Sequence, residues 1–313
     1  MHQPLRPAAL RPGDLVTLVS PSGPVRAEHV ADGVTLLESW GLRVSVGRYT
    51  YSRNGFFAGT DGERLADLNA ALADPQVRGV VCTRGGYGAQ RIVDGIDMRA
   101  VLAGPKLVVG FSDITALQLA LWRGARLATV HGPGPRRLAE LAPACAESMR
   151  RAVMTDEPVV VARDPTEETA PVRVAGTARG TLLGGNLCLI ASTVGTLDMP
   201  DLSGALLLLE DLQEPPYKVD RMLTHLRRAG VLSAVAGVAV GQFTECADEW
   251  PVSVVDVLRD RLCDLGVPVL GGLPVGHGAG QLTVPLGVPA TLDADAGTLT
   301  VEAGVKTVTA GYG

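Results

Sequence analysis

A serine stands at the point where an apolar stretch gives way to a helical pattern, at Ser112 in Leu107-Val-Val-Gly-Phe-Ser-Asp-Ile-Thr115. The apolar residues predict a strand that ends at Gly110, and the residues from Ile114 onward predict a helix. A serine on such a turn exposes its hydroxyl, and the amides that open the helix face any negative charge formed beside it. This geometry is typical of a catalytic nucleophile. Because the segment lacks the second glycine of the G-x-S-x-G motif, a helix N-cap at Ser112 or Asp113 is the alternative interpretation.

Two later segments offer an acid and a base. The apolar residues 205–209 predict a strand, and Glu210 follows them at the end of the strand, where chemistry is usually carried. His277 stands among glycines, which let a backbone approach a ligand and leave the imidazole accessible. Taken singly, Glu210 could be a solvated strand end and His277 a loop histidine. With Ser112 they form the order Ser, Glu, His, which is the chain order of the α/β-hydrolase triad.

This triad predicts an acyl-transfer mechanism. His277 takes the proton of the Ser112 hydroxyl and returns it to the leaving amine, while Glu210 holds the imidazole in the useful tautomer. The negative charge on the carbonyl oxygen requires amide donors that are already in place. We expect these donors to be the backbone amides of Asp113 and of the Gly85–Gly86 turn, Gly86 in particular, since glycine lets the backbone approach the substrate.

A substrate carboxylate would need a cation or a cluster of helix-start amides, and Arg84, just before this turn, is the basic candidate nearest in the sequence. A surface ion pair is the alternative role for Arg84. The Arg84-Gly-Gly-Tyr-Gly88 turn also suits a phosphate or dinucleotide loop, but the third position of G-x-G-x-x-G falls on Arg91. A nucleotide-binding protein and a non-catalytic ligand-binding protein are therefore kept as lesser alternatives.

Two further polar residues have a structural and a functional interpretation. Asn186, which follows Gly184-Gly185, is either a turn residue, which we favour, or a contact near the site. His131 ends a predicted strand and could approach the site. We expect it to be a scaffold histidine whose polar atoms are satisfied.

The composition excludes several classes of protein. The chain has 313 residues, 46% of them hydrophobic and 19% charged, with a net charge of −5 and only 4% aromatic residues, which argues against a nucleic-acid partner. No apolar run has the length of a signal peptide or a membrane span, so we expect a soluble protein. Five dispersed cysteines without C-x-x-C spacing predict neither disulfides nor zinc, and indicate a reducing cytoplasm. We expect no metal and no cofactor.

The elements that must position these residues alternate in the first half of the chain. Strands are predicted at 14–20, 42–46, 79–83, 107–110 and 128–131, with helices at 27–40 and from 61, which indicates a parallel sheet covered on both faces. A polar, proline-containing connector near 158–175 suggests a division into domains 1–165 and 166–313. The second half predicts helices near 218 and at 252–265 and a hairpin at 293–297. The fold class is therefore α/β, with a Rossmann-like domain and a smaller α+β or barrel-like domain, and we expect the site in the cleft between them.

Five segments carry a family resemblance over about residues 10 to 290: Arg84-Gly-Gly-Tyr-Gly-Ala89, Gly110-Phe-Ser-Asp-Ile-Thr115, Leu183-Gly-Gly-Asn-Leu187, Glu210-Asp211 with Pro216-Tyr217 and Asp220-Arg-Met-Leu223, and Gly276-His277. In this order they resemble the LD-carboxypeptidases, whose relatives include the microcin C self-immunity peptidase. The resemblance implies a serine peptidase with a Ser-Glu-His triad that releases a terminal D-amino acid, D-alanine in the first instance, from cytoplasmic murein tetrapeptides. It also implies a homodimer. The alternative within the family is hydrolysis of a peptidyl- or aminoacyl-nucleotide conjugate.

Overall fold

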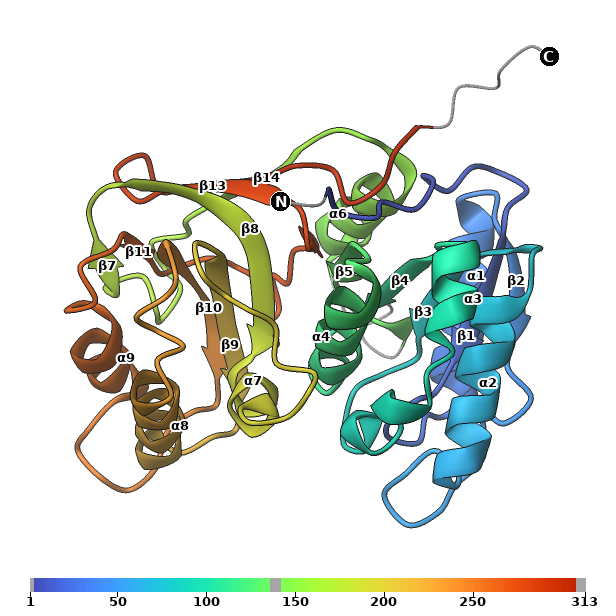
Figure 1. The fold of residues 1–313 in the computed structure, drawn as a ribbon, viewed down its shortest axis with the longest axis horizontal. Helices are drawn as coiled ribbons and strands as arrows, with labels where there is room; N and C mark the ends of the chain where they lie inside the picture. Colours follow the sequence, from blue (N-terminus) through green and yellow to red (C-terminus); the bar gives the residue numbers. More distant parts are fainter. Residues whose placement is uncertain (1–2, 136–141, 308–313) are drawn as a thin grey trace.

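The computed structural model of the chain describes residues 3–135 and 142–307. Its strands form two sheets, each with its own set of helices, and the two parts lie side by side (Figure 1). Helix α4 (Ile114–Ala125) lies between them and contacts elements of both. Within the described residues, no helix combines the length and the apolar character that a membrane span requires.

The first sheet contains the predicted parallel strands. Its strand order is β12-β5-β4-β3-β1-β2. The strands β1 to β5 pair in parallel and span Leu15–Val19, Arg43–Val46, Val77–Cys82, Leu107–Gly110 and Thr129–His131. Most of their side chains are buried, as expected for short apolar strands that are covered on both faces.

Helices cover both faces of this sheet. Helices α2 (Asp61–Ala73), α3 (Met98–Ala103) and α4 pack on one face, and α1 (Ala27–Ser39) and α6 (Pro143–Met154) pack on the other. Two short 3-10 helices, Ala89–Arg91 and Val93–Gly95, follow the glycine turn after β3. The expected Rossmann-like arrangement is confirmed, because every crossover between the parallel strands places a helix or a turn outside the sheet.

The second sheet is mixed and curled. Its order is β6-β14-β13-β8-β9-β10-β11-β7. The strands β6 to β11 span Val159–Ala162, Arg173–Val174, Thr177–Asn186, Leu206–Leu212, Gly237–Thr244 and Val269–Leu270, and β13 and β14 span Pro289–Asp293 and Thr298–Val301. Helices α7 (Leu187–Thr193), α8 (Pro216–Arg228) and α9 (Val254–Leu262) cover one face. On the other face, β13, β14 and β6 enclose a second apolar core, which confirms the predicted α/β class with a second domain of α+β or barrel-like form.

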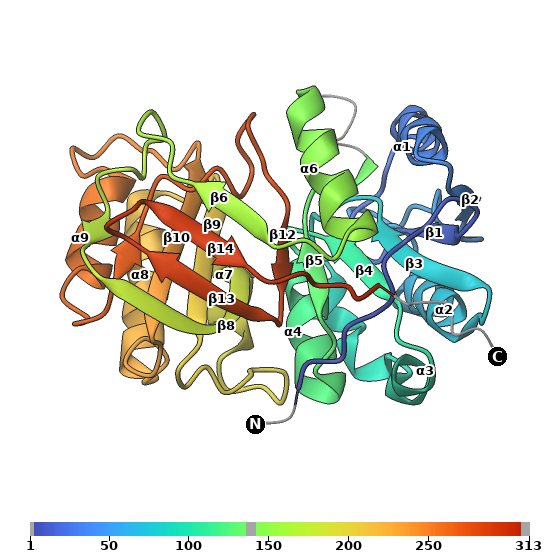
Figure 2. The ribbon, with the colours of Figure 1, turned by 90° about the horizontal axis from the view of Figure 1, so that it is seen from above.

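Two strands cross between the parts of the chain. Strand β12 (Val284–Leu286) comes late in the sequence but pairs with β5 in the first sheet, as Figure 2 shows from above. Strand β6 precedes the division that we expect after residue 165, yet it pairs with β14 in the second sheet. The domain bounds stay a prediction. The strand pairing shows that the two parts are tied together by segments distant in sequence.

Candidate active site

Ser112 occupies a strained turn between β4 and α4. Its φ is 64°, in the left-handed region that residues other than glycine rarely adopt. Asp113, the N-cap residue of α4, makes no capping hydrogen bond with its side chain. Four non-glycine residues have a positive φ in the described part of the chain, and three of them, Ser112, Gln213 and Glu245, line one cavity. Strain of this kind concentrates at functional sites, which favours the nucleophile interpretation of Ser112 over the cap.

The glycine turn after β3 contacts this serine directly. A Cβ atom built on Gly85 would lie 2.7 Å from Cβ and 2.9 Å from Oγ of Ser112, and 3.1 Å from the amide nitrogen of Asp113. Gly86, the next residue, has a φ of 122°. Only glycine fits at Gly85 without displacing Ser112, so the turn brings bare backbone against the serine and the first amides of α4.

The carboxylate of Asp113 ties this turn to the serine. Its Oδ2 accepts hydrogen bonds from Oγ of Ser22 at 2.6 Å and from the amide of Ala89 at 2.8 Å. Asp113 is 2% exposed, and burial raises the pKa of its carboxyl group. From the sequence, Asp113 was expected to act through its backbone amide or as a helix N-cap. The side chain adds a second function, because it connects the nucleophile turn with the loop after β1 and the end of the glycine turn.

Replacing Asp113 by alanine should therefore lower kcat more than it changes KM. Loss of the acceptor releases the glycine turn, and a displaced oxyanion donor costs on the order of 10² in kcat. Asp113→Asn is the matched variant, because its Oδ1 can still accept both hydrogen bonds, and it should retain most of the activity. Steady-state kinetics on both variants checks this. Equal losses in the two variants would show that the carboxylate does not act through these hydrogen bonds.

Arg84 also shapes the turn. Its Nε donates to the carbonyl oxygen of Gly85 and its Nη1 to that of Pro24, both at 3.1 Å. The side chain is half-buried and lines the cavity. Arg84 therefore combines a structural contact with a place in the cavity lining, and its role toward a substrate carboxylate stays a prediction.

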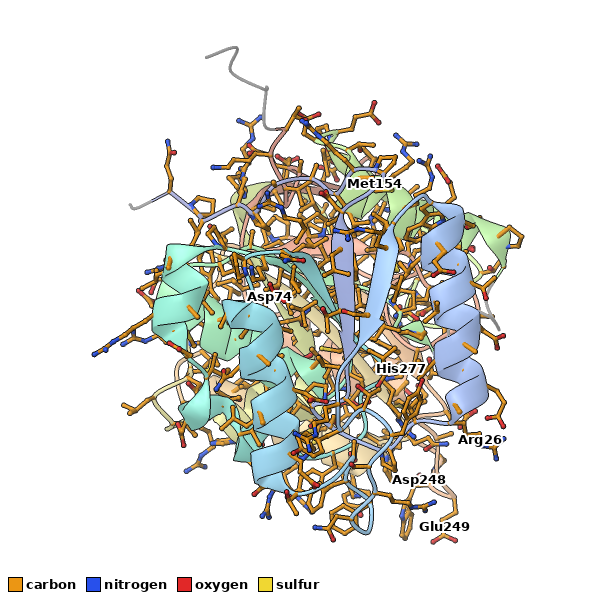
Figure 3. All side chains as sticks on the ribbon, turned by 90° about the vertical axis from the view of Figure 1, so that its right-hand side faces the viewer. Arg26, Asp74, Met154, Asp248, Glu249 and His277 are labelled. Carbon is orange, nitrogen blue, oxygen red and sulfur yellow. The ribbon has the colours of Figure 1, made fainter. Side chains whose placement is uncertain are left out.

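His277 and Glu210 form a buried pair. Nδ1 of His277 lies 2.6 Å from Oε2 of Glu210, although 67 positions separate them in the sequence. His277 is 9% exposed and Glu210 is fully buried. Burial by itself raises the pKa of Glu210, but the charge and hydrogen bond of His277 outweigh it, so the pKa lies below its usual value. In Figure 3, seen from the side of the first sheet, His277 lies within the outline of the molecule, in keeping with its burial.

Two neighbours hold this pair in place. The ring of Phe111, the residue before Ser112, lies 4.8 Å from the imidazole of His277, centroid to centroid. Gly276 has a φ of 143°, and a Cβ there would lie 3.1 Å from Oε2 of Glu210. The glycine beside the histidine thus permits the close approach of the carboxylate, and the phenylalanine connects the histidine to the turn that carries Ser112.

Asn186 is not the turn residue that we favoured, because it ends β8 and caps α7; it lines the cavity, and its role as a contact near the site stays a prediction. Its Oδ1 accepts from the amide of Leu189 at 3.2 Å and so caps helix α7. Its Nδ2 donates to Oδ1 of Asp211 at 2.8 Å, and its side chain is buried against the cavity. Asp211 also accepts from the amides of Cys188 and Leu212. Burial and the charge of Glu210 raise the pKa of Asp211 to about 7.

The cavity has a volume of about 430 Å³ and an uneven charge. Arg84 lies on the side of the first sheet, whereas Asp211, Glu214 and Glu245 come from the second part of the chain. Glu245 accepts from Nε2 of Gln213 at 2.6 Å, which links the ends of β9 and β10. The complete lining is Thr83, Arg84, Gly85, Gly86, Phe111, Ser112, Gly134, Asn186, Cys188, Leu189, Asp211, Leu212, Gln213, Glu214, Thr244, Glu245 and His277.

The acidic side of this cavity was not predicted from the sequence. Asp211 follows Glu210 directly, and a second carboxylate after a buried strand was the signal that could have identified it. Gln213 and Glu245 gave no such signal, because only their left-handed backbone and their contact distinguish them. Six of the predicted site residues line the cavity: Arg84, Gly85, Gly86, Ser112, Asn186 and His277. Asp113 follows Ser112 in the chain but is not part of the lining, and Glu210 contacts the cavity residue His277.

His131 differs from its prediction. It is fully buried, but neither ring nitrogen has a hydrogen-bond partner among the described residues, so the expectation of a satisfied scaffold histidine is wrong. Burial lowers its pKa to about 4. His131 is the last residue of β5, and its ring lies against Gly185 of the second sheet. The backbone groups of its own sheet therefore do not hydrogen-bond to the ring nitrogens.

Metal-binding side chains do not gather in the described residues: His, Cys, Asp and Glu form no group of three or more that could hold an ion. The cavity is instead equipped with a hydroxyl, an imidazole paired with a carboxylate, and backbone amides around a glycine turn. This set of groups suits acyl transfer to a serine.

Known proteins share both the sequence and the fold. Residues 16–132 match the model of the LD-carboxypeptidase N-terminal domain, and residues 179–292 match that of the C-terminal domain. A Bacillus subtilis protein named as a probable murein peptide carboxypeptidase is 37% identical over 309 residues, 96% of this chain and 95% of that protein. The muramoyltetrapeptide carboxypeptidase structure from Oxalobacter formigenes has a TM-score of 0.81 and 28% identity, over 94% of this chain and all of that chain (100%).

A second group of solved structures shares the fold alone. The microcin C7 self-immunity protein in complex with glutamyl sulfamoyl guanosine has a TM-score of 0.86 at 23% identity, and the match covers 96% of this chain and 98% of that chain. The two-part arrangement of sheets is therefore common to proteins named for murein peptides and to one crystallised with an aminoacyl-nucleotide analogue.

Proposed function

Because this chain belongs to the LD-carboxypeptidase family, we propose that it is a serine peptidase that releases a terminal D-amino acid, D-alanine in the first instance, from murein tetrapeptides. The observation that carries the proposal is the meeting of the strained Ser112 turn with the His277–Glu210 pair at one cavity. Peptidase-family membership accounts for the reaction class. The triad and the substrate are the parts that we propose.

The proposed reaction begins with proton transfer from Oγ of Ser112 to Nε2 of His277, whose other nitrogen is engaged by Glu210. The serine oxygen attacks the carbonyl carbon that precedes the D-residue. The resulting oxyanion accepts hydrogen bonds from the amides of Asp113 and Gly86. His277 then returns the proton to the leaving amine, the acyl-enzyme forms, and water attacks it by the same route.

The cavity offers groups that can receive the terminal carboxylate of a peptide, which supports the murein peptide as the first candidate. Arg84 lines the cavity, and the amides that open α4 follow Ser112. The hydrolysis of aminoacyl-nucleotide conjugates is the second candidate, supported by the fold shared with the microcin C7 self-immunity protein.

A substrate panel tests the proposal. The free-acid tetrapeptide with terminal D-alanine should be cleaved with release of D-alanine, and its C-terminal amide should show a kcat/KM lower by about 10²-fold. That is the scale of a lost charge-assisted contact of about 3 kcal/mol. A tetrapeptide with terminal L-alanine controls for stereochemistry. Product release is followed by chromatography of the dansylated amino acid.

Other outcomes redirect the proposal. Equal cleavage of the acid and the amide would reject recognition of the terminal carboxylate. Faster cleavage of an aminoacyl-sulfamoyl adenosine than of any peptide would establish the alternative. The homodimer and the cytoplasmic location, which the family resemblance implies, stay predictions that accompany this function.

A further inference from the structure

His131 lies where the two parts of the molecule meet, beside the proposed active site. It is the last residue of β5 and pairs in register with Gly110, two residues before Ser112. Its ring reaches the second sheet at Gly185, where a built Cβ would lie 3.3 Å from its Nδ1. The next residue, Asn186, pairs in register with Glu210. His131 therefore lies between the strand that leads to the nucleophile and the strand that carries the acid.

Three buried polar atoms in this region lack hydrogen-bond partners within the described residues. They are Nδ1 and Nε2 of His131 and Oε1 of Glu210, the carboxylate oxygen that does not contact His277. A neutral imidazole has one N–H donor and one acceptor nitrogen, and a carboxylate oxygen is an acceptor. Native proteins rarely leave such groups unpaired, and a buried water with two or more polar partners is the usual solution. The unpaired groups are complementary, because the ring of His131 offers an N–H donor and Oε1 of Glu210 is an acceptor.

We propose that His131 is a positioning residue of the catalytic triad, which donates one ring N–H through a single buried water to Oε1 of Glu210. This contact holds the carboxylate in the orientation that directs Oε2 at His277. The proposal rests on the function proposed above, because it concerns the same triad. It adds a residue from the first sheet that orients an acid on the second.

The electrostatics suit a neutral donor. The charged or titratable groups that act on His131 are Glu210, whose charge raises the pKa of its ring, and His277, whose charge lowers it. Burial outweighs both and lowers the pKa of His131 to about 4. Around neutral pH the ring is therefore uncharged. It can orient Glu210 without adding a second cation that would compete with the protonated His277 for the carboxylate.

Phe111 packs near both histidines. Its ring lies 6.2 Å from that of His131 in an edge-on arrangement and 4.8 Å from that of His277. Neither ring nitrogen of His131 has a hydrogen-bond partner among the described residues, and His131 is not part of the cavity lining. We therefore assign it a positioning role through Glu210 rather than a catalytic role.

The test compares three substitutions at this position. His131→Phe keeps a planar ring but removes both nitrogens, while His131→Asn and His131→Gln return an N–H donor at a shorter and a longer reach. His225→Gln, at an exposed histidine on α8, is the control. On the free-acid tetrapeptide, we expect His131→Phe to lower kcat about 10-fold with KM within about twofold, which corresponds to about 1.4 kcal/mol. At least one amide variant should recover kcat.

The pH dependence separates positioning from packing. Without its donor, Glu210 becomes a stronger acceptor for the N–H of His277, so the acidic limb of the kcat/KM profile should move to higher pH in His131→Phe and return in the rescued variant. The same displacement should appear in the substrate-free enzyme when His277 is titrated by NMR with nitrogen-15-labelled histidine. A purely structural role would lower the melting temperature and leave this midpoint unchanged.

The experiment separates failure of the His131 inference from failure of the proposed peptidase function. If the parent enzyme cleaves no L,D-peptide, the function fails, and the NMR titration of the resting protein still decides the role of His131. A kcat for His131→Phe within twofold of the parent, or an unchanged midpoint in all variants, overturns the inference. If His131→Phe does not fold, the two amide variants decide: retention of the parental midpoint by at least one supports the water-mediated contact, and equal displacement in both rejects it.

Discussion

Ser112→Ala should abolish hydrolysis while the protein stays folded. The substitution removes one oxygen from an accessible turn, and the loss of a triad nucleophile lowers kcat by on the order of 10⁴ to 10⁶. Turnover of the free-acid tetrapeptide measures the effect. No acyl-enzyme should be detected by mass spectrometry of the variant, whereas the parent should show one under rapid quenching if deacylation is slow enough to trap it.

Ser112→Gly is the matched control for the backbone at this position. Alanine and serine at a φ of 64° are strained, and glycine is not. The glycine variant should therefore be as inactive as the alanine variant but more stable, by roughly 1 kcal/mol or more, because alanine at a positive φ is strained and glycine is not. Activity within tenfold of the parent in either variant would remove Ser112 from the nucleophile role.

The second large effect concerns His277 and Glu210. His277→Ala should lower kcat by on the order of 10⁴ or more, and Glu210→Gln should impair the same step, because an amide in place of the carboxylate does not hold the useful tautomer. Adding either change to Ser112→Ala should cost little more, since groups that act as one unit are strongly non-additive. Single-turnover kinetics isolates the acylation step.

A surface carboxylate provides the control for this series. Asp264 pairs with Arg227 at 2.7 Å and is largely exposed, so Asp264→Asn changes charge without touching the cavity and should leave kcat unchanged. Independent, multiplicative losses from Ser112→Ala and His277→Ala would contradict a triad. Melting temperatures must accompany the kinetics, because Glu210 is fully buried and its replacement also affects packing.

Local patterns predicted much of the fold. The apolar runs of β1 to β5 are short and the helical periodicity from Ala27 and from Asp61 is clear, so these elements form where the sequence places them. The apolar run before Glu210 likewise forms β9, and the hairpin of β13 and β14 follows from its turn residues. Such features depend on side-chain alternation and on turn chemistry within a few residues.

Long-range pairing decided what these patterns could not. The return of β12 to the first sheet and the place of β6 in the second depend on which edges remain free after the cores have packed. The contact of Asp113 with Ser22 and Ala89 and the approach of Gly85 to Ser112 depend on how three loops meet above one sheet. No spacing in the sequence encodes these distances.

The groups available for chemistry, and the strands that carry them, could be read from local patterns: a serine at a strand-to-helix turn, an acid at a strand end and a histidine among glycines. Three features emerge only in the folded chain: the acid and the histidine form a buried pair at 2.6 Å, one wall of the cavity is acidic, and His131 has no hydrogen-bond partner among the described residues. The difference lies in the sequence separation of the residues that interact. Backbone conformation follows from neighbouring residues, whereas burial, pKa and hydrogen-bond partners depend on side chains brought together from distant segments by packing of the two cores.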